Sequence, residues 1–179
     1  MADLEPAREI PRPRSSASPP AGPAARGIRA YYELTKPGIA AFVVITAGVA
    51  FYVASGGRPP ALALVHTLVG TLLGTAGSLA LNQYAEREVD ARMERTRTRP
   101  LPSGRLSPRS ALGFGLILLA TGTAYLWVSV GVLPAALTLG AAFCYNLVYT
   151  PLKPRTYAAT FAGAIPGATP ALIGWSAAQ

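Results

Sequence analysis

The sequence predicts an all-α protein, a polytopic transmembrane bundle of helices. Apolar side chains make up 51% of the 179 residues and charged side chains only 13%, which is too apolar for an ordinary soluble domain. The charged residues are separated by long uncharged runs, and each run reaches the roughly 20 residues that a membrane-spanning helix needs. These runs lack the alternating polarity of membrane barrel strands, so helices are predicted.

The uncharged runs predict five membrane-spanning helices. Pro37 starts the first, because proline is well tolerated in the first turn of a helix. The third and fourth share one uncharged run, which we divide at Gly131 because glycine, with Pro134 just after it, favours a turn. The expected spans are residues 37–57, 59–85, 110–130, 132–150 and 156–179.

The first 28 residues predict a disordered cytoplasmic tail, because they are rich in Pro, Ala, Ser and Arg and cannot bury enough apolar surface to order themselves. They contain no apolar stretch that could form the core of a signal peptide. An organellar transit peptide is a weaker alternative, since acidic residues occur in the segment. Residues 29–179 are then the transmembrane part.

The chain carries a net charge of +8, and the positions of its positive residues predict its topology in the membrane. All but one of the 16 Lys and Arg residues lie before the first expected span, between the second and third, or between the fourth and fifth; the exception is Arg58. Because positive residues favour cytoplasmic loops, these connections and the amino terminus are expected in the cytoplasm. We expect a multi-pass protein of the bacterial inner membrane, surrounded by membrane lipid and with no nucleic acid as partner.

Residues that suggest chemistry follow the second expected span. Asn82, Glu86 and Asp90 are four residues apart, so on a continuing helix they lie along one stripe. Glu86 and Asp90 are predicted metal ligands that share one Mg²⁺. Asn82, about 12 Å from Asp90 along the axis, would bind a second ion or a phosphate oxygen. Guanidinium groups that suit phosphate oxygens come next, at Arg92, Arg95, Arg97 and Arg99.

A simpler interpretation of this segment stays open. The acidic and basic residues could belong to a solvated helical extension with pairs four residues apart, and the arginines could anchor the topology. Spacing alone supports both interpretations about equally. The aligned carboxylates favour the polyphosphate site modestly, because topological anchoring needs only basic residues.

Four motifs occur in order along the chain. The first is Asn82-Gln83-x-x-Glu86-x-x-x-Asp90-x-x-Met93-x-Arg95-Thr96, running on to Arg99-Pro100-Leu101. The others are Leu34-Thr35-Lys36-Pro37-Gly38, Tyr149-Thr150-Pro151-Leu152-Lys153-Pro154-Arg155-Thr156, and Gly163-Ala164-Ile165-Pro166-Gly167-Ala168-Thr169-Pro170 with Gly174-Trp175. Over residues 31–179 the chain resembles the intramembrane aromatic prenyltransferases, and its Met-x-Arg-Thr stretch resembles the branch of that family that farnesylates haem.

The resemblance implies the transfer of a farnesyl group from farnesyl diphosphate to a vinyl carbon of haem B, so these two molecules are expected partners and Mg²⁺ the expected cofactor. It implies that four residues of the first motif are catalytic, namely Asn82, Glu86, Asp90 and Arg95. Of these, Glu86 and Asp90 are expected to hold the metal. It implies substrate binding by Lys36, Arg99, Tyr149 and Lys153. The two lysines could instead be snorkelling anchors, and the tyrosine an interfacial aromatic residue.

One departure from the family pattern limits these expectations. Family members resemble bundles of nine helices with a second acidic motif, whereas the last acidic residue here is Glu94. We expect an incomplete copy, with about five of nine helices, that is inactive alone. Two other functions stay open: a prenyltransferase for another acceptor such as a quinone precursor, and a non-enzymatic membrane scaffold subunit.

Two features of the second span carry smaller predictions. Gly70-x-x-x-Gly74 predicts a close contact between helices. His66 stands alone in an apolar stretch, where a histidine is more often packed or hydrogen-bonded than a ligand of haem iron.

Overall fold

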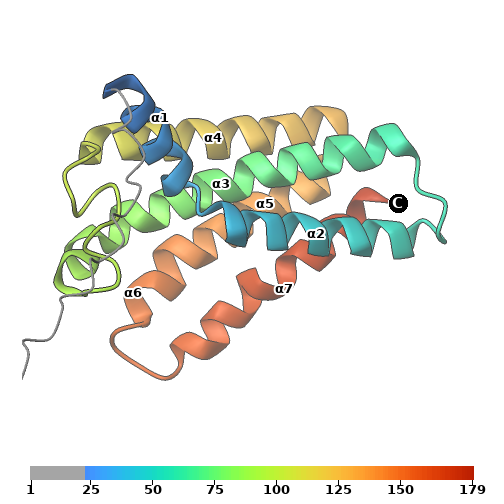
Figure 1. Cartoon of the computed structure of the whole chain (residues 1–179). Coiled ribbons are helices and arrows are strands. Elements are labelled where there is room, and N and C mark those ends of the chain that lie inside the picture. Colours follow the sequence, from blue (N-terminus) through green and yellow to red (C-terminus); the bar gives the residue numbers. More distant parts are fainter. Residues whose placement is uncertain (1–22) are drawn as a thin grey trace, which may run out of the picture.

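The computed structural model describes residues 23–179, and this part of the chain contains helices and no strand (Figure 1). The all-α prediction is therefore confirmed. The helices are α1 (Pro23–Leu34), α2 (Pro37–Ala54), α3 (Ala61–Arg92), α4 (Pro108–Ser129), α5 (Val132–Phe143), the π-helical η1 (Cys144–Tyr149), α6 (Thr150–Leu152) and α7 (Ala159–Ala177). Most of the predicted tail lies outside the described residues, and its last residues, 23–28, belong to α1.

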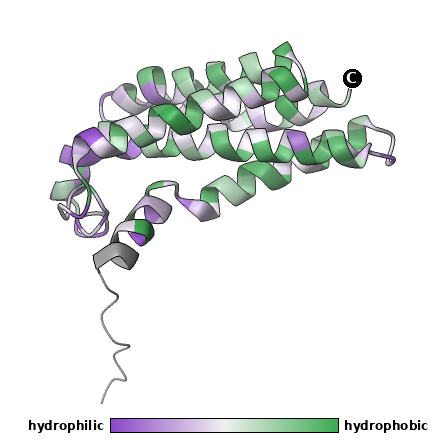
Figure 2. Cartoon of the chain, turned by 90° about the horizontal axis from the view of Figure 1, so that it is seen from above, coloured by the Kyte–Doolittle hydropathy of each residue, from purple (hydrophilic) through white to green (hydrophobic). Residues whose placement is uncertain are grey.

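Four helical stretches are long and apolar enough to cross a membrane. They are α2, α3, α4 and the continuous stretch Val132–Leu152, which runs from α5 through α6. The helix α7 occupies the fifth expected span; it is not one of these four, and it stays continuous through Pro166 and Pro170. Large apolar side chains such as Phe42 and Val128 are exposed on the bundle, as expected for surfaces that face lipid. Figure 2 shows hydrophobic colour along the helices and strong hydrophilic colour in the loop after α3.

The predicted helix boundaries agree with the structure. The helix α2 begins at Pro37, whose ring suits the first turn. The chain turns between α4 and α5 at Gly131, which has φ of 154°, and Pro134 lies in the first turn of α5. The helix α3 continues to Arg92, beyond the apolar run, so the acidic motif is helical as its spacing required.

Glycines let α3 and α4 approach closely. A Cβ atom at Gly70 would collide with the Leu126 side chain of α4, and one at Gly122 of α4 would collide with the backbone of Gly74. The prediction of a close helix contact at Gly70-x-x-x-Gly74 is confirmed. On another side of the bundle, α7 packs against α2, where Gly174 meets the backbone of Ala47.

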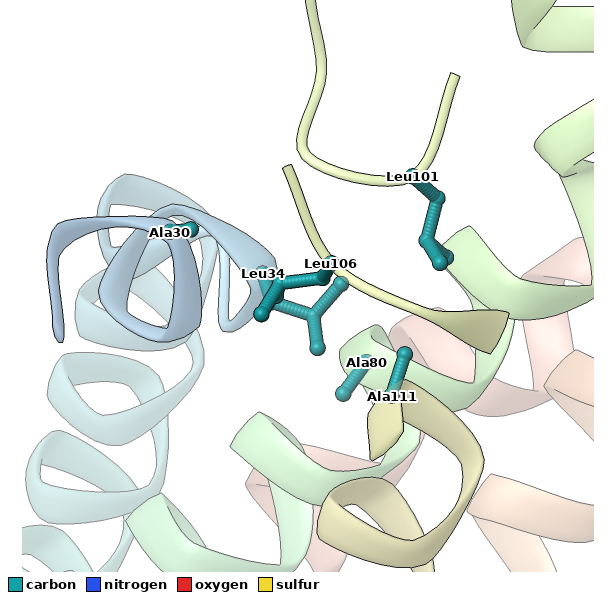
Figure 3. Close-up of a cluster of buried hydrophobic side chains, with 6 residues drawn as sticks. All are labelled: Ala30, Leu34, Ala80, Leu101, Leu106 and Ala111. Carbon is teal, nitrogen blue, oxygen red and sulfur yellow. The ribbon is translucent and has the colours of Figure 1, made fainter. Parts of the chain in front are cut away.

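A cluster of buried apolar side chains holds the segments at the polar end of the bundle against one another (Figure 3). It connects α1, the loop of residues 93–107, and the adjoining parts of α3 and α4. Its members are Ala30, Leu34, Ala80, Leu101, Leu106 and Ala111. Because these side chains exclude water together, α1 and the loop are fixed against α3 at the turns that carry the acidic motif.

Candidate functional site

The acidic motif meets three basic side chains at the polar end of α3. The Lys36 amine donates to Oδ1 of Asn82 at 2.6 Å, and the Lys153 amine donates to Oε1 of Glu86 at 3.2 Å. Arg99 donates from Nη1 to Oδ2 of Asp90 at 2.6 Å. Lys36 comes from the junction of α1 and α2, Arg99 from the loop after α3, and Lys153 from the end of α6. Asn82, Glu86 and Asp90, which we call the acidic row, therefore each have one basic partner, and each partner comes from a different segment of the chain.

The partners of the two acids differ from the pairs that the solvated-helix interpretation predicts. That interpretation requires the partners of Glu86 and Asp90 to lie on α3 itself, four residues away. Instead the partner of Glu86 lies 67 residues away, and the partner of Asp90 lies in the loop that follows α3. Asp90 is only 4% exposed. A carboxylate is almost never buried without a partner, so Arg99 is what allows Asp90 to lie inside the protein.

Both the oxygen and the nitrogen of the Asn82 side-chain amide are hydrogen-bonded. Its oxygen accepts from Lys36, and its nitrogen donates to Oγ1 of Thr150 at 3.0 Å. Thr150 in turn donates to the carbonyl of Tyr145 at 2.8 Å. The predicted role of Asn82 toward metal or phosphate is untested by these contacts, which tie three helices together around it. No spacing in the sequence pointed to Thr150, because its partner lies 68 residues away.

Lys36 is unusual in both backbone and charge. With φ of 47° and ψ of 63° it adopts the left-handed conformation, which costs roughly 1–2 kcal/mol for a residue other than glycine. Its pKa is lowered to about 8, first because burial disfavours the charged amine and then because Arg99 repels it, while Glu86 and Asp90 partly oppose this. A diphosphate near this amine would favour its charged form.

An apolar cavity of about 610 Å³ lies beside the ionic cluster. It is bounded by α2, α3, α5 with η1, and α7, and Lys153 lines it while also binding Glu86. Apolar side chains such as Val43, Leu79 and Ile173 line the wall. The volume falls within the range of about 300–1,000 Å³ typical of small-molecule sites. The arrangement suits a molecule with an ionic head and a long apolar chain.

Two tyrosines of η1 line this cavity together. The rings of Tyr145 and Tyr149 are stacked, with centroids 5.6 Å apart and an interplanar angle of 16°. A Cβ atom at Gly163 would press against the ring of Tyr149, so the glycine leaves room for that ring. Sequence reasoning named Tyr149 and missed Tyr145. Its position one helical turn earlier was the available signal.

Two other predicted donors, Arg95 and Arg97, make no hydrogen bond or ion pair with the acidic row within the described residues. Arg95 is exposed, and its side chain has no hydrogen bond or ion pair within the described residues. Arg97 pairs at 3.6 Å with the exposed Glu94. No group of three or more His, Cys, Asp or Glu side chains arranged for a metal ion occurs in residues 23–179. The two carboxylates could therefore hold a metal only together with other ligands.

His66 lies in the first turns of α3, far along the helix from the acidic motif. Its Nδ1 atom is 2.7 Å from the hydroxyl of Tyr125 on α4, and the two rings are tilted by 52°. The prediction that this histidine is hydrogen-bonded is confirmed.

Comparison with known proteins agrees with the motifs. The UbiA prenyltransferase family matches residues 43–179. A protoheme IX farnesyltransferase of Myxococcus xanthus is 48% identical over 149 residues, covering 81% of this chain and 49% of that protein. One of Solibacter usitatus is 42% identical over 163 residues, covering 84% of this chain and 55% of that protein. The chain thus spans about half the length of these curated relatives.

A solved structure supports the fold. It is described as that of a digeranylgeranylglyceryl phosphate synthase in membranes, and it superposes with a TM-score of 0.78 at 19% identity. The match covers 86% of this chain and 54% of that structure. At this identity the likeness concerns the arrangement of helices.

Proposed function

Because the chain belongs to the UbiA prenyltransferase family, we propose that it carries the diphosphate-binding side of a site that farnesylates haem. The relatives named protoheme IX farnesyltransferase support haem B as the acceptor and a farnesyl donor. One structural observation supports the proposal most strongly: three basic side chains converge on the Asn82–Asp90 row beside an apolar cavity. The donor, farnesyl diphosphate, has a matching ionic head and apolar chain.

Magnesium is proposed as the cofactor, held by Glu86 and Asp90. Two carboxylates one helical turn apart suit this ion, which proteins bind with one or two carboxylates plus water and substrate phosphate. Both carboxylates now pair with cations, Lys153 and Arg99. A diphosphate would give these two cations a new partner and free carboxylate oxygens. Bound there, the ion would neutralise charge on the departing diphosphate.

The basic side chains would stabilise the leaving group. When the allylic C–O bond breaks, diphosphate departs with the bonding electrons, and Lys36, Arg99 and Lys153 can donate hydrogen bonds to its oxygens. The exposed Arg95, which the family motif contains, is proposed to bind the outer phosphate oxygens. The farnesyl chain would lie in the cavity, where the faces of Tyr145 and Tyr149 can stabilise the allylic cation.

The acceptor step completes the proposed reaction. The π electrons of a haem vinyl group form the new C–C bond to the farnesyl carbon that carried diphosphate. Water then adds to the cation left on the vinyl group and loses a proton, which leaves a hydroxyethylfarnesyl side chain. The described apolar cavity would limit the access of water to the allylic cation before the C–C bond forms.

The orientation in the membrane is part of the proposal. The ionic cluster, α1 and residues 93–107 form one end of the bundle (Figure 1), while Arg58 lies at the other end, between α2 and α3. The excess of basic residues at the first end supports placing it in the cytoplasm of a bacterial cell, with the protein in the inner membrane.

The decisive experiment measures farnesyl transfer by the complete gene product in membranes. Farnesyl diphosphate, Mg²⁺ and haem B are supplied, and the product is identified by mass spectrometry. Asp90→Asn should reduce transfer by at least about 10²-fold, because it removes an electrostatic stabiliser of the leaving group. The matched control is Glu88→Gln, an exposed acid of the same helix whose one ion pair within residues 23–179 is with Arg87.

Other outcomes would contradict the proposal in distinct ways. Prenylation of a quinone precursor with no transfer to haem would indicate the other acceptor. A well-inserted protein that prenylates neither molecule would favour a scaffold. Wild-type turnover in Asp90→Asn would remove the diphosphate role of the acidic row.

A further inference from the structure

The elbow between α1 and α2 controls where the Lys36 amine lies. The helix α1 ends at Leu34, α2 begins at Pro37, and only two residues join them. Lys36 is the one non-glycine residue with positive φ in the described chain. This conformation is intrinsically unfavourable, and contacts from outside the elbow add to its turn hydrogen bonds, in which the amides of Thr35 and Lys36 donate to the carbonyls of Tyr32 and Glu33.

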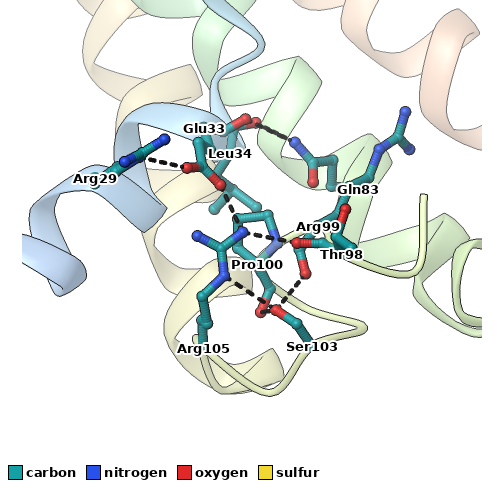
Figure 4. A network of polar contacts seen from close by, with 9 residues as sticks. All are labelled: Arg29, Glu33, Leu34, Gln83, Thr98, Arg99, Pro100, Ser103 and Arg105. Atoms are coloured by element: carbon teal, nitrogen blue, oxygen red, sulfur yellow. Dashed lines mark hydrogen bonds and ion pairs between the residues drawn. The ribbon is translucent and has the colours of Figure 1, made fainter. Parts of the chain in front are cut away.

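The side chain of Gln83 supplies such contacts. Its amide nitrogen donates to the carbonyl oxygens of Glu33 at 3.1 Å and Leu34 at 2.9 Å (Figure 4). These are the last carbonyls of α1, which lack partners within their own helix; that of Glu33 also accepts from the backbone amide of Lys36 at 3.3 Å. Gln83 is 2% exposed, so water cannot easily replace it as their donor.

The same turn of α1 is held from its outer side as well. The Glu33 carboxylate accepts from Arg29 at 3.0 Å and from Arg105 at 2.6 Å, and Arg105 also donates to the carbonyl of Thr98 (Figure 4). Leu34 is fully buried in the apolar cluster. These contacts dock α1, whereas Gln83 alone of these side chains binds the backbone at the elbow.

Asn82 and Gln83 are neighbours on α3, and they hold the two sides of this elbow. Gln83 binds the backbone just before it, and Asn82 binds the amine of the residue that forms it. We propose that Gln83 is a positioning residue, which holds the α1–α2 elbow so that the Lys36 amine reaches the diphosphate site. This inference deepens the proposed function and rests on it for the identity of the ligand.

The test combines two readouts on the complete gene product in detergent. Inorganic diphosphate binding is measured by calorimetry, and backbone hydrogen exchange is measured over residues 33–38. Gln83→Met keeps the side-chain length but removes both hydrogen bonds. It should speed exchange at the elbow and weaken diphosphate binding about three- to tenfold, the effect expected from about one net hydrogen bond.

A double-mutant cycle separates positioning from general damage. In a Lys36→Met background, Gln83→Met should weaken diphosphate binding no further, because the amine it positions is gone. The control Phe114→Leu loosens the contact between Phe114 and Tyr31 of α1 and should lower thermal stability with diphosphate binding unchanged. If Gln83→Met does not accumulate, Gln83→Asn, whose amide is one methylene shorter, is measured in the same cycle.

The outcomes distinguish this inference from the proposed function. Unchanged exchange at the elbow in the Gln83 variant, or equal weakening with and without Lys36, would overturn the positioning role even if the wild type binds diphosphate. A wild type that binds no diphosphate would overturn the proposed function, and the positioning of Lys36 for diphosphate with it. Faster exchange together with weakening that depends on Lys36 would establish the role.

Discussion

Lys153 donates to Glu86 across 67 residues of sequence, with 3.2 Å between the amine and the carboxylate oxygen. The pair joins the end of α6 to α3 at the edge of the apolar cavity, because Lys153 also lines that cavity. A farnesyl diphosphate in this cavity would bring its phosphates to the same place. The ion pair therefore marks where we expect the substrate head to bind.

Glu86→Gln should reduce farnesyl transfer about 10²-fold, and raising Mg²⁺ should partly restore it if Glu86 is a metal ligand. The rate is measured against Mg²⁺ concentration in membranes that contain the complete gene product. Arg87→Gln serves as control, because Arg87 stacks over the ring of Tyr84 at 4.5 Å and pairs with Glu88 instead of with a member of the row. A Glu86→Gln rate that stays low at every Mg²⁺ concentration would count against a metal role.

Diphosphate binding should weaken as pH rises above about 8, the lowered pKa of Lys36. The sign follows from charge: below that pH the amine is protonated and attracts phosphate, and above it the amine is neutral. For folding, the unfolded lysine keeps its proton to higher pH, so this group's contribution to stability rises between pH 8 and the ordinary lysine pKa of 10.5. Binding titrations at several pH values check this. A Lys36→Met protein with the same pH dependence would refute the assignment.

Gly167→Leu should narrow the cavity and favour a shorter prenyl donor. Gly167 lines the cavity, and a Cβ atom there would meet nothing within 4 Å, so the larger side chain fills open space without a collision at its base. We expect the KM for farnesyl diphosphate to rise about tenfold, and that for geranyl diphosphate to rise much less, since the geranyl chain is one isoprene unit shorter and leaves that part of the cavity empty. The control is Ala168→Leu, at an exposed position of α7 that does not line the cavity. Equal effects of Gly167→Leu on both donors would place the farnesyl chain elsewhere.

Gly122→Ala should destabilise the bundle by about 1–3 kcal/mol, the usual range for overpacking. The added methyl group would collide with the Gly74 backbone of α3, which has no side chain that could move aside. Thermal unfolding in detergent measures the change. Gly113→Ala on the same helix has open space at its Cβ and should be neutral or slightly stabilising. Similar losses in both variants would mean that the close α3–α4 contact is not the cause.

Cysteine labelling should place the ionic cluster in the cytoplasm. With Cys144 replaced by alanine, Thr98→Cys should react only with reagents on the cytoplasmic side, and Pro60→Cys only with reagents on the opposite side. Both positions are exposed, at opposite ends of α3. Labelling of Thr98→Cys from outside would reverse the orientation that the basic loops predict.

Helices were the part of this structure that the sequence predicted well. Charge-free length identified the spans, Pro37 and Gly131 marked their boundaries, and four-residue spacing correctly implied that α3 carries Asn82, Glu86 and Asp90 on successive turns. Each of these signals is local, because a helix is built from contacts between near neighbours.

Contacts between distant segments could not be predicted from spacing. Nothing in the order of residues says that Thr150 meets Asn82, or that Arg99 rather than Arg95 meets Asp90. The Arg99–Asp90 pair depends on how the loop of residues 93–107 folds back on α3, and the Thr150–Asn82 pair depends on how α6 packs against α3. The motif resemblance named several of the residues that meet, including Lys36 and Lys153, but gave no partner for any of them.

The π-helical turn of η1, Cys144–Tyr149, sets the angular phase of everything after it. A π turn behaves as one extra residue within an α-helix. Winding the same residues as ordinary α-helix would rotate the following chain by about 100° and advance it by about 1.5 Å. Lys153 would then swing away from Glu86. The position of Lys153 relative to Glu86 therefore depends on how η1 is wound as well as on its number of residues, so a substitution that restored α-helical winding would displace the lysine without changing the length of the chain.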